Sequence, residues 1–172
     1  MEDTSIVSQE LLKALFSYNE ETGEFTRKLT TGSKAKIGSI AGYLNDAGYI
    51  EIIVNANKYR AHRLVWLYVF GKFPTSQIDH IDNNRSNNAL SNLREATNLQ
   101  NSYNKPTSKL NTTGYKGVSI DKRSNRYRAY ISVNGKQKSL GYYATAEEAS
   151  EAYTTAAKEL HKEYYNEDTV HS

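Results

Sequence analysis

Residues 78–101 have the sequence IDHIDNNRSNNALSNLREATNLQN, and the predicted fold is built around them. A short apolar run ends in Asp79-His80, and the Asn-rich segment that follows is typical of a loop. Asn98 is placed to cap a short helix. This order predicts a β-β-α hairpin that brings Asp79, His80 and Asn101 near one another, although 22 positions separate Asp79 from Asn101.

The polar residues of this hairpin suit the hydrolysis of a phosphodiester. A histidine such as His80 serves as a general base because its unperturbed pKa lies close to neutral pH. Asp79 and the amide oxygen of Asn101 are hard oxygen donors, the kind of ligand that Mg²⁺ or Mn²⁺ prefers. One base beside one oxygen-liganded cation is the minimum set for this reaction.

These residues resemble the HNH nuclease motif, in the Asp-His…Asn…Asn form found in phage and intron-encoded homing endonucleases. Asp79-His80 match the opening pair, Asn92 the middle position, and Asn101 the last, where many HNH nucleases have His. The resemblance implies that His80 and Asn92 are catalytic residues. It also implies one Mg²⁺ or Mn²⁺ ion, rather than zinc, on Asp79 and Asn101.

Each of these residues also has an ordinary structural interpretation. His80 could be a satisfied histidine at the end of a strand. Asn92 could cap the backbone of its own turn, whereas the functional interpretation is that its amide ties the loop to the hairpin and holds the His80 ring. Arg63 is a candidate DNA contact because Arg binds phosphate in a bidentate way, but the pair His62-Arg63 could equally cap a helix or pair with an acid.

The first seventy residues predict small elements that support this motif. A short helix capped by Ser8 and a hairpin over residues 18–28 come first. The strongest strand covers residues 49–54. An apolar helix over residues 61–71, ending at Gly71, is expected to be the core helix under the active site.

A second folded unit is predicted from about residue 114, after a polar stretch that is typical of a linker. Its three strands cover residues 116–120, 126–133 and 136–142, and Asn134-Gly135 favours a type I′ turn between the last two. A capping box at Thr145-Ala-Glu-Glu148 begins a helix that packs on the sheet through an alanine-rich stripe.

This unit resembles the Apetala/ethylene-response DNA-binding domain, which also occurs fused to phage HNH nucleases. The resemblance rests on residues 115–118, 127–131, 140–143 and 144–157. It implies that a three-stranded sheet reads the major groove of DNA. The plant recognition sequence cannot be carried over, because the chain departs from plant members at Ser119, Asp121, Tyr127, Ser139 and Thr154.

Charge is concentrated in this unit. Residues 103–142 carry nine Lys and Arg residues and one acid, a net charge of +8, although the whole chain has a net charge of only +3. A basic block in a near-neutral chain is a candidate footprint on nucleic acid, and the alternative is a solvated sheet face. The candidate DNA-binding residues are Lys116, Arg126, Arg128, Tyr130 and Lys138, with the two lysines expected near the arginines.

The predicted fold class is therefore α+β. A β-rich support segment covers residues 1–60, and a ββα-metal nuclease core covers residues 61–104. A linker over residues 105–113 leads to a small three-stranded antiparallel sheet packed on one α-helix, residues 114–165, and a tail over residues 166–172. His161 and His171, near the end, are expected to face solvent.

Composition limits the possible classes of protein. The chain has no cysteine, which excludes Cys-ligated zinc, disulfides and thiol nucleophiles, and this agrees with a reducing cytoplasm. No apolar run approaches the roughly 18 residues that a bilayer span requires, and Met1-Glu2-Asp3 is not the start of a signal peptide. We expect a soluble, cytoplasmic protein of a phage-infected or bacterial cell, with no membrane partner.

The predicted function is a metal-dependent endonuclease acting on double-stranded DNA, with one Mg²⁺ or Mn²⁺ ion. One active site per chain predicts a monomer that nicks one strand, and a double-strand break would need a dimer or a second binding event. The main alternative is a non-catalytic, sequence-specific DNA-binding regulator with a degenerate nuclease fold. An RNA-directed protein is disfavoured because the sheet lacks the aromatic signature of common RNA-binding sheet modules.

Overall fold

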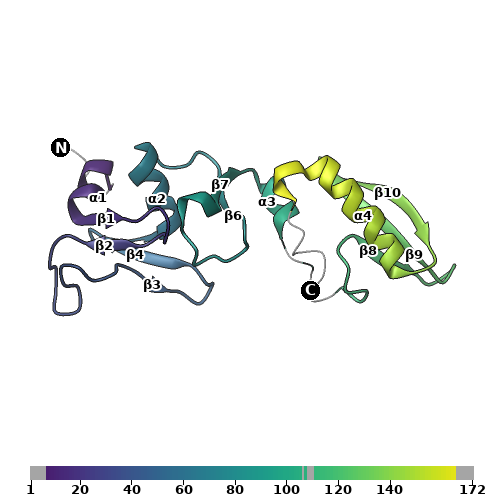
Figure 1. Cartoon of the computed structure of the whole chain (residues 1–172), viewed down its shortest axis with the longest axis horizontal. Coiled ribbons are helices and arrows are strands. Elements are labelled where there is room, and N and C mark those ends of the chain that lie inside the picture. The colour runs from purple at the N-terminus through teal and green to yellow at the C-terminus, as the bar shows by residue number, and fades with distance from the viewer. Residues whose placement is uncertain (1–6, 106, 108–110, 166–172) are drawn as a thin grey trace. The chain divides into compact units, whose positions relative to one another are not determined.

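The computed structural model describes residues 7–105, 107 and 111–165, and the chain divides into two compact units between Glu95 and Ala96 (Figure 1). Each unit combines helices with small sheets, which confirms the α+β class. The predicted tail, part of the predicted linker (residues 106 and 108–110) and Met1-Glu2-Asp3 lie outside the described residues. In the described part of the chain, no helix has the length and apolar character needed to cross a membrane.

The first unit begins with a helix and a hairpin, as predicted. Helix α1 (Gln9–Leu15) starts at Ser8, whose hydroxyl accepts a hydrogen bond from a backbone N–H of the first turn. Strands β1 (Phe16–Tyr18) and β2 (Phe25–Arg27) then pair antiparallel. Gly23 lies in their turn with a φ of +75°, a conformation that glycine adopts at less cost than other residues.

A three-stranded sheet and one helix follow. The strand order is β3 (Tyr43–Leu44), β4 (Ile50–Val54) and β5 (Asn57–Arg60), and both pairs are antiparallel. Helix α2 (Ala61–Phe70) continues directly from β5. It ends where predicted, at Gly71, which has a φ of 72° and donates its N–H to a carbonyl of the last turn.

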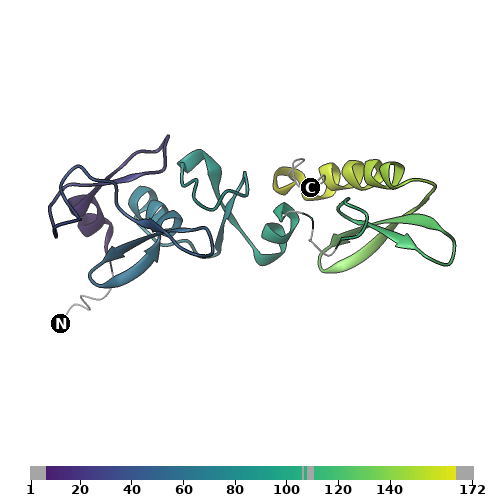
Figure 2. The ribbon, with the colours of Figure 1, turned by 90° about the horizontal axis from the view of Figure 1, so that it is seen from below.

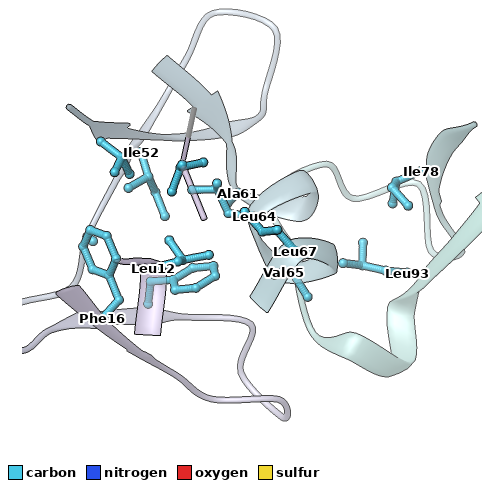
Figure 3. Packing of buried hydrophobic residues seen from close by; sticks show 13 residues of the cluster. Leu12, Phe16, Ile52, Ala61, Leu64, Val65, Leu67, Ile78 and Leu93 are labelled. Carbon is cyan, nitrogen blue, oxygen red and sulfur yellow. The ribbon is translucent and has the colours of Figure 1, made fainter. Parts of the chain in front are cut away.

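Helix α2 forms the centre of the apolar core of this unit. In Figure 3 its side chains lie between Leu12, Phe16 and Ile52 on one side and Ile78 and Leu93 on the other. Burying a side chain of this kind is worth about 1.5–3 kcal/mol. The helix therefore ties the segment that contains Ile78 and Leu93 to the sheet and the N-terminal hairpin.

That segment consists of β6 (Gln77–His80) and β7 (Leu93–Ala96), which form a two-stranded sheet, joined by the Asn-rich loop. The loop ends in a single 3-10 turn, η1 (Leu90–Asn92). The N-terminal hairpin forms hydrogen bonds with this loop. The hydroxyl of Tyr18 donates to the carbonyl of Asn88 at 2.8 Å, and the N–H of Leu90 donates to the carbonyl of Glu20 at 3.0 Å.

The second unit opens with helix α3 (Asn98–Asn104). The prediction that Asn98 caps this helix is wrong, because the cap is Thr97. The hydroxyl of Thr97 accepts from the N–H of Gln100, and the Gln100 side chain accepts from the N–H of Thr97. This reciprocal capping box satisfies two backbone donors, and Asn98 has no Gln or Glu three residues further on with which to form one.

A three-stranded antiparallel sheet follows in the order β10-β9-β8, with strands β8 (Val118–Asp121), β9 (Arg126–Val133) and β10 (Lys136–Tyr143). Asn134 and Gly135 have φ values of 50° and 76°, as the predicted type I′ turn requires. Helix α4 (Ala146–His161) lies along one face of this sheet (Figure 2) and ends in a 3-10 turn, η2 (Lys162–Tyr164).

The contact between α4 and the sheet follows the predicted pattern. The capping box of Thr145 and Glu148 is present at the start of the helix. Ala149, Tyr153 and Ala157 are buried against the sheet, so small side chains let the helix lie close to it. Among the described residues of this unit, no helix packs on the opposite face of the sheet (Figure 2).

We predict that Gly23→Ala destabilises the first unit far more than Gly48→Ala. A Cβ at Gly23 would lie 2.3 Å from backbone atoms of Asn88 and Ala89, whereas a Cβ at Gly48 meets nothing within 4 Å. Both glycines have positive φ, 75° and 82°, so the strain of about 1–2 kcal/mol from conformation alone is common to the two variants.

The measurement is urea unfolding followed by the fluorescence of Trp66, the single tryptophan of the chain, which lies in α2. The loss of unfolding free energy in Gly23→Ala beyond that in Gly48→Ala measures the clash between the hairpin and the Asn-rich loop. Equal losses in the two variants would contradict this packing.

Candidate functional site

Asp79 and His80 end strand β6 and are both buried, with 4% and 5% of their surface exposed. Asp79 forms an ion pair with Arg94 of the neighbouring strand β7. Nε and Nη2 of Arg94 lie 2.9 Å and 2.7 Å from Oδ2 of Asp79. A buried carboxylate needs such a partner, because removing an isolated charge from water is costly.

The His80 ring lies within hydrogen-bond distance of the Asn-rich loop. Its Nε2 is 3.4 Å from Oδ1 of Asn88, a side chain that is 2% exposed. Burial lowers the pKa of His80, and the effect is opposed by the hydrogen bond to Asn88 and by the charges of Asp82 and Asp79. The imidazole is therefore neutral near pH 7, the state in which it can accept a proton.

A second histidine packs against the first. The ring of His62, from α2, lies edge-on to the His80 ring with centroids 5.1 Å apart and an angle of 87°. Burial lowers the pKa of His62 to about 3, and the charges of Arg60, of Arg63 and of His80 when it is protonated act in the same direction. Nδ1 of His62 is buried and has no hydrogen-bond partner in the part of the chain that the structure describes.

Asn92 fastens the loop to the end of β6. Its Oδ1 accepts from the N–H of Asp82 at 3.0 Å, and its Nδ2 donates to Oδ1 of Asp82 and to the carbonyl of Asn87, both at 2.9 Å. Its carbonyl accepts from the N–H of Ile81. These bonds agree with a role in tying the loop to the hairpin, while the loop side chain at Nε2 of His80 is that of Asn88.

Asn101 lies on α3, half-buried, in the second compact unit, whereas Asp79 and His80 belong to the first. The predicted proximity of Asn101 to the other two residues stays a prediction. Among the described residues, no group of three or more His, Asp or Glu side chains could hold a metal ion. The donor types still fit Mg²⁺ or Mn²⁺, since one carboxylate and one amide oxygen are hard ligands.

Helix α3 is held firmly within its own unit. The ammonium of Lys116 donates to the carbonyls of Tyr103 and Lys105, at 2.6 Å and 2.5 Å, at the C-terminal end of the helix. The ring of Tyr103 stacks on that of His161, with centroids 3.7 Å apart and planes 8° apart. The unit that contains the DNA-binding candidates therefore also fixes the helix that carries Asn101.

The expectation that His161 faces solvent is wrong. The residue is 5% exposed, and its Nε2 lies 3.2 Å from the carbonyl of Ser132. The helical spacing indicated that His161 would be buried, because it continues the buried i, i+4 series of Ala149, Tyr153 and Ala157. His171, the other histidine of this expectation, lies outside the described residues.

The open face of the sheet carries Arg126, Arg128 and Tyr130, as the alternation in β9 predicts, since Ala129 and Ile131 point to the helix. Arg126 donates to the carbonyl of Tyr142. Nε of Arg128 is buried without a hydrogen-bond partner, and its Cζ lies 5.9 Å from the centre of the Tyr130 ring.

The two lysines occupy other positions in this unit. Lys138 pairs with Ile131 across the sheet, and directly opposed residues share a face, so Lys138 is on the side of α4 although its side chain is exposed. Lys116 holds the end of α3 instead, and burial lowers its pKa to about 8.

Arg63 lies on α2, half-buried, with its Cζ 5.6 Å from the centre of the Phe73 ring. The sequence alone did not identify Asn88 or Arg94 as parts of the site. Asn88 is one of several asparagines in its loop, and Arg94 is recognised only once β6 and β7 are paired. The side chain of Asn88 contacts His80 and that of Arg94 contacts Asp79, and neither residue matches a position of the HNH motif.

Comparisons with known proteins agree with both parts of the chain. A family model described as HNH endonuclease matches residues 59–103, and one described as AP2 domain matches residues 113–163. The chain is 39% identical over 106 residues to protein 3.8 of Escherichia phage T7, and the match covers 61% of this chain and 87% of that protein.

A second relative is an HNH endonuclease of Acanthamoeba polyphaga mimivirus, described as uncharacterized, with 38% identity over 124 residues. The match covers 71% of this chain and 63% of that protein, so the chain spans less than two thirds of this relative. A solved structure of the HNH homing endonuclease I-HmuI, on its DNA binding and cleavage, matches at 24% identity with a TM-score of 0.41, covering 84% of this chain and 75% of its own. A TM-score of 0.41 is too low for this likeness to establish a shared fold.

We predict that the first unit loses stability as the pH falls below about 6.5, and that His62→Gln reduces this loss. The pKa of His62 is about 3 in the folded protein and 6.5 in the unfolded chain, so on acidification the unfolded chain binds the proton first. The contribution of neutral His62 to the free energy of unfolding is fully present above pH 6.5, and it is lost as the pH falls toward 3.

Between pH 7.5 and pH 5 this residue accounts for about 2 kcal/mol of the loss. Urea unfolding of wild type and His62→Gln at the two pH values, followed by Trp66 fluorescence, measures the difference. His80, whose pKa is also lowered, contributes to both proteins alike. Parallel pH dependences in the two proteins would show that His62 is not held neutral by burial.

Proposed function

Since the chain belongs to the HNH endonuclease family and carries a C-terminal AP2 domain, we propose that it is a metal-dependent endonuclease that hydrolyses double-stranded DNA. Both resemblances drawn from the sequence are confirmed by these matches. The observation that carries the proposal is the Asp79-His80 pair, buried at the end of β6 with a neutral imidazole in contact with Asn88.

His80 acts as the general base. A hydrogen bond to Oδ1 of Asn88, which only accepts, requires the proton to be on Nε2, so Nδ1 is the nitrogen able to take a proton from water. The water oxygen bonds to phosphorus, the bond from phosphorus to the 3′ oxygen breaks, and that oxygen is protonated. The family resemblance implies 5′-phosphate and 3′-hydroxyl products.

Asp79 and Asn101 are the residues that would hold one Mg²⁺ or Mn²⁺ ion. When bound, such an ion stabilises the charge that develops at phosphorus and at the leaving oxygen. Asp79 already shares Oδ2 with Arg94, so metal binding either leaves Arg94 beside the ion or displaces it from the carboxylate. Asn92 is a positioning residue in this scheme, because it fixes the loop that carries Asn88.

The AP2 domain targets the nuclease. Arg126, Arg128 and Tyr130 share the open sheet face, which is the face we assign to DNA, and phosphate neutralisation by such arginines supplies much of the affinity. Arg63 is retained as a candidate phosphate contact of the first unit. Lys116, which holds the end of α3, and Lys138, which is exposed on the side of α4, are retained as candidate DNA contacts outside this face.

One active site per chain implies that a monomer nicks one strand and that a double-strand break needs two chains. Both relatives are viral proteins, and we infer that the protein acts inside an infected cell. The alternative, a non-catalytic DNA-binding regulator, is favoured by one observation, the ion pair that occupies Oδ2 of the Asp79 carboxylate.

We predict that His80→Ala lowers the rate of plasmid cleavage by about 10²–10⁴-fold, the usual contribution of a general base, while DNA binding is unchanged. The assay follows conversion of supercoiled to open-circle plasmid with Mg²⁺ or Mn²⁺, and EDTA abolishes it. Binding measured by gel shift serves as the control for folding. Cleavage by His80→Ala at the wild-type rate contradicts the assignment, and binding without cleavage by wild type favours the regulator.

We also predict that Arg94→Met destabilises the first unit by about 3 kcal/mol, because it removes the guanidinium that forms an ion pair with a buried carboxylate. If Asp79 is a metal ligand, Mg²⁺ then raises the melting temperature of Arg94→Met more than that of wild type. Arg94→Lys, which keeps the charge, is the matched control. An equal effect of Mg²⁺ on all three proteins would speak against Asp79 as a ligand.

A further inference from the structure

Two arginines of the first unit stack on one tyrosine beside the histidine pair. The Cζ atoms of Arg60 and Arg85 lie 4.3 Å and 5.1 Å from the centre of the Tyr49 ring. The same ring lies 5.4 Å from that of His62 and 6.0 Å from that of His80. The sequence alone did not identify Tyr49, Arg60 or Arg85 as site residues.

The cluster is assembled from three separate segments. Tyr49 closes a turn in which its N–H donates to Oδ1 of Asn45, directly before β4. Arg60 is the last residue of β5. Arg85 belongs to the Asn-rich loop, and its Nη1 donates to the carbonyl of Ala47 at 3.0 Å, which fixes the loop to the turn. The arrangement is therefore built by the fold and not by neighbours in sequence.

Arg60 and Arg85 are exposed residues, and neither has an ion-pair partner among the described residues. Glu51 lies opposite Arg60 in the sheet, and its carboxylate accepts hydrogen bonds from Asn45 and Tyr43, which lower its pKa, with a smaller effect from the charge of Arg60. Two like charges on one aromatic ring repel each other, and an anion bound beside them relieves that repulsion. A guanidinium stacked on an aromatic ring can still donate from its edge to phosphate oxygens.

We propose that Arg60 and Arg85, supported by Tyr49, bind backbone phosphates of the DNA strand next to His80. The inference rests on the proposed function for its choice of anion. It adds a phosphate-binding site within the nuclease unit, separate from the sheet of the AP2 domain. In this site Arg60 and Arg85 position the strand, and His80 remains the catalytic residue.

The test is the salt dependence of binding of the full chain to a DNA duplex, measured by fluorescence anisotropy in EDTA. Each lost phosphate contact makes the plot of log affinity against log salt concentration less steep by about 0.9, and it weakens binding roughly eightfold at 0.1 M salt. We expect this change for Arg60→Ala and for Arg85→Ala. Arg60→Lys and Arg85→Lys, which keep the charge, retain most of the slope.

Lys58→Ala is the matched control. Lys58 is exposed on the same strand as Arg60 and also stacks on a tyrosine, with its Nζ 6.0 Å from the centre of the Tyr43 ring. We expect its slope to equal that of wild type. Tyr49→Leu, which removes the aromatic support, should weaken binding as the arginine variants do, whereas Tyr49→Phe should not.

An unchanged slope in both arginine-to-alanine variants, or the same change in Lys58→Ala, overturns the proposal. Absence of any duplex binding by wild type overturns it together with the proposed function. Because binding is measured without metal, the expected slopes support the phosphate site even if wild type never cuts DNA, so the two failures are distinguishable. In a protein that cuts, the arginine variants should raise KM more than they lower kcat.

Discussion

The shape of the Asn-rich loop between β6 and β7 depends on hydrogen bonds within the loop and from the segments around it. Asn92 closes the loop from within by bonds to Asp82 and Asn87. Tyr18 and the backbone of Glu20 hold it from the N-terminal hairpin. Asn88, which faces His80, has its position set by both groups of bonds.

Burial sets the chemistry of the residues that this loop covers. His62 and His80 pack edge to face under it, and both have a lowered pKa because a charged imidazole loses its hydration there. The carboxylate of Asp79, buried in the same strand, is compensated by Arg94. Two adjacent residues of the site therefore differ in charge: His80 is a neutral base, and Asp79 is an acid paired with Arg94.

Much of the fold could be predicted because local chemistry and periodicity agreed. The Asn134-Gly135 turn, the capping box at Thr145 and the alternation of β9 each have a strong local cause. The helix cap at Thr97 was missed because two adjacent residues can both cap, and only the position of Gln100 distinguishes them. The Asp-His…Asn…Asn positions came from a family resemblance and not from periodicity.

Other features could not be predicted because they depend on segments that meet only in the folded chain. Pairing of β6 with β7 brings Arg94 to Asp79, and the cross-strand register decides the face of Lys138. The cluster of Tyr49, Arg60 and Arg85 joins three segments that the sequence shows as a turn, a strand end and a loop.

The attachment of α3 has a consequence for how such proteins can exchange parts by recombination. The HNH match ends at residue 103, and a junction placed there looks natural from the sequence. The contacts that hold α3, however, come from Lys116 and His161, both within the AP2 match. A chimera joined at that point would keep Asn101 and lose its support unless the incoming domain supplied equivalent residues. The inheritable module therefore includes α3 together with the domain that follows it.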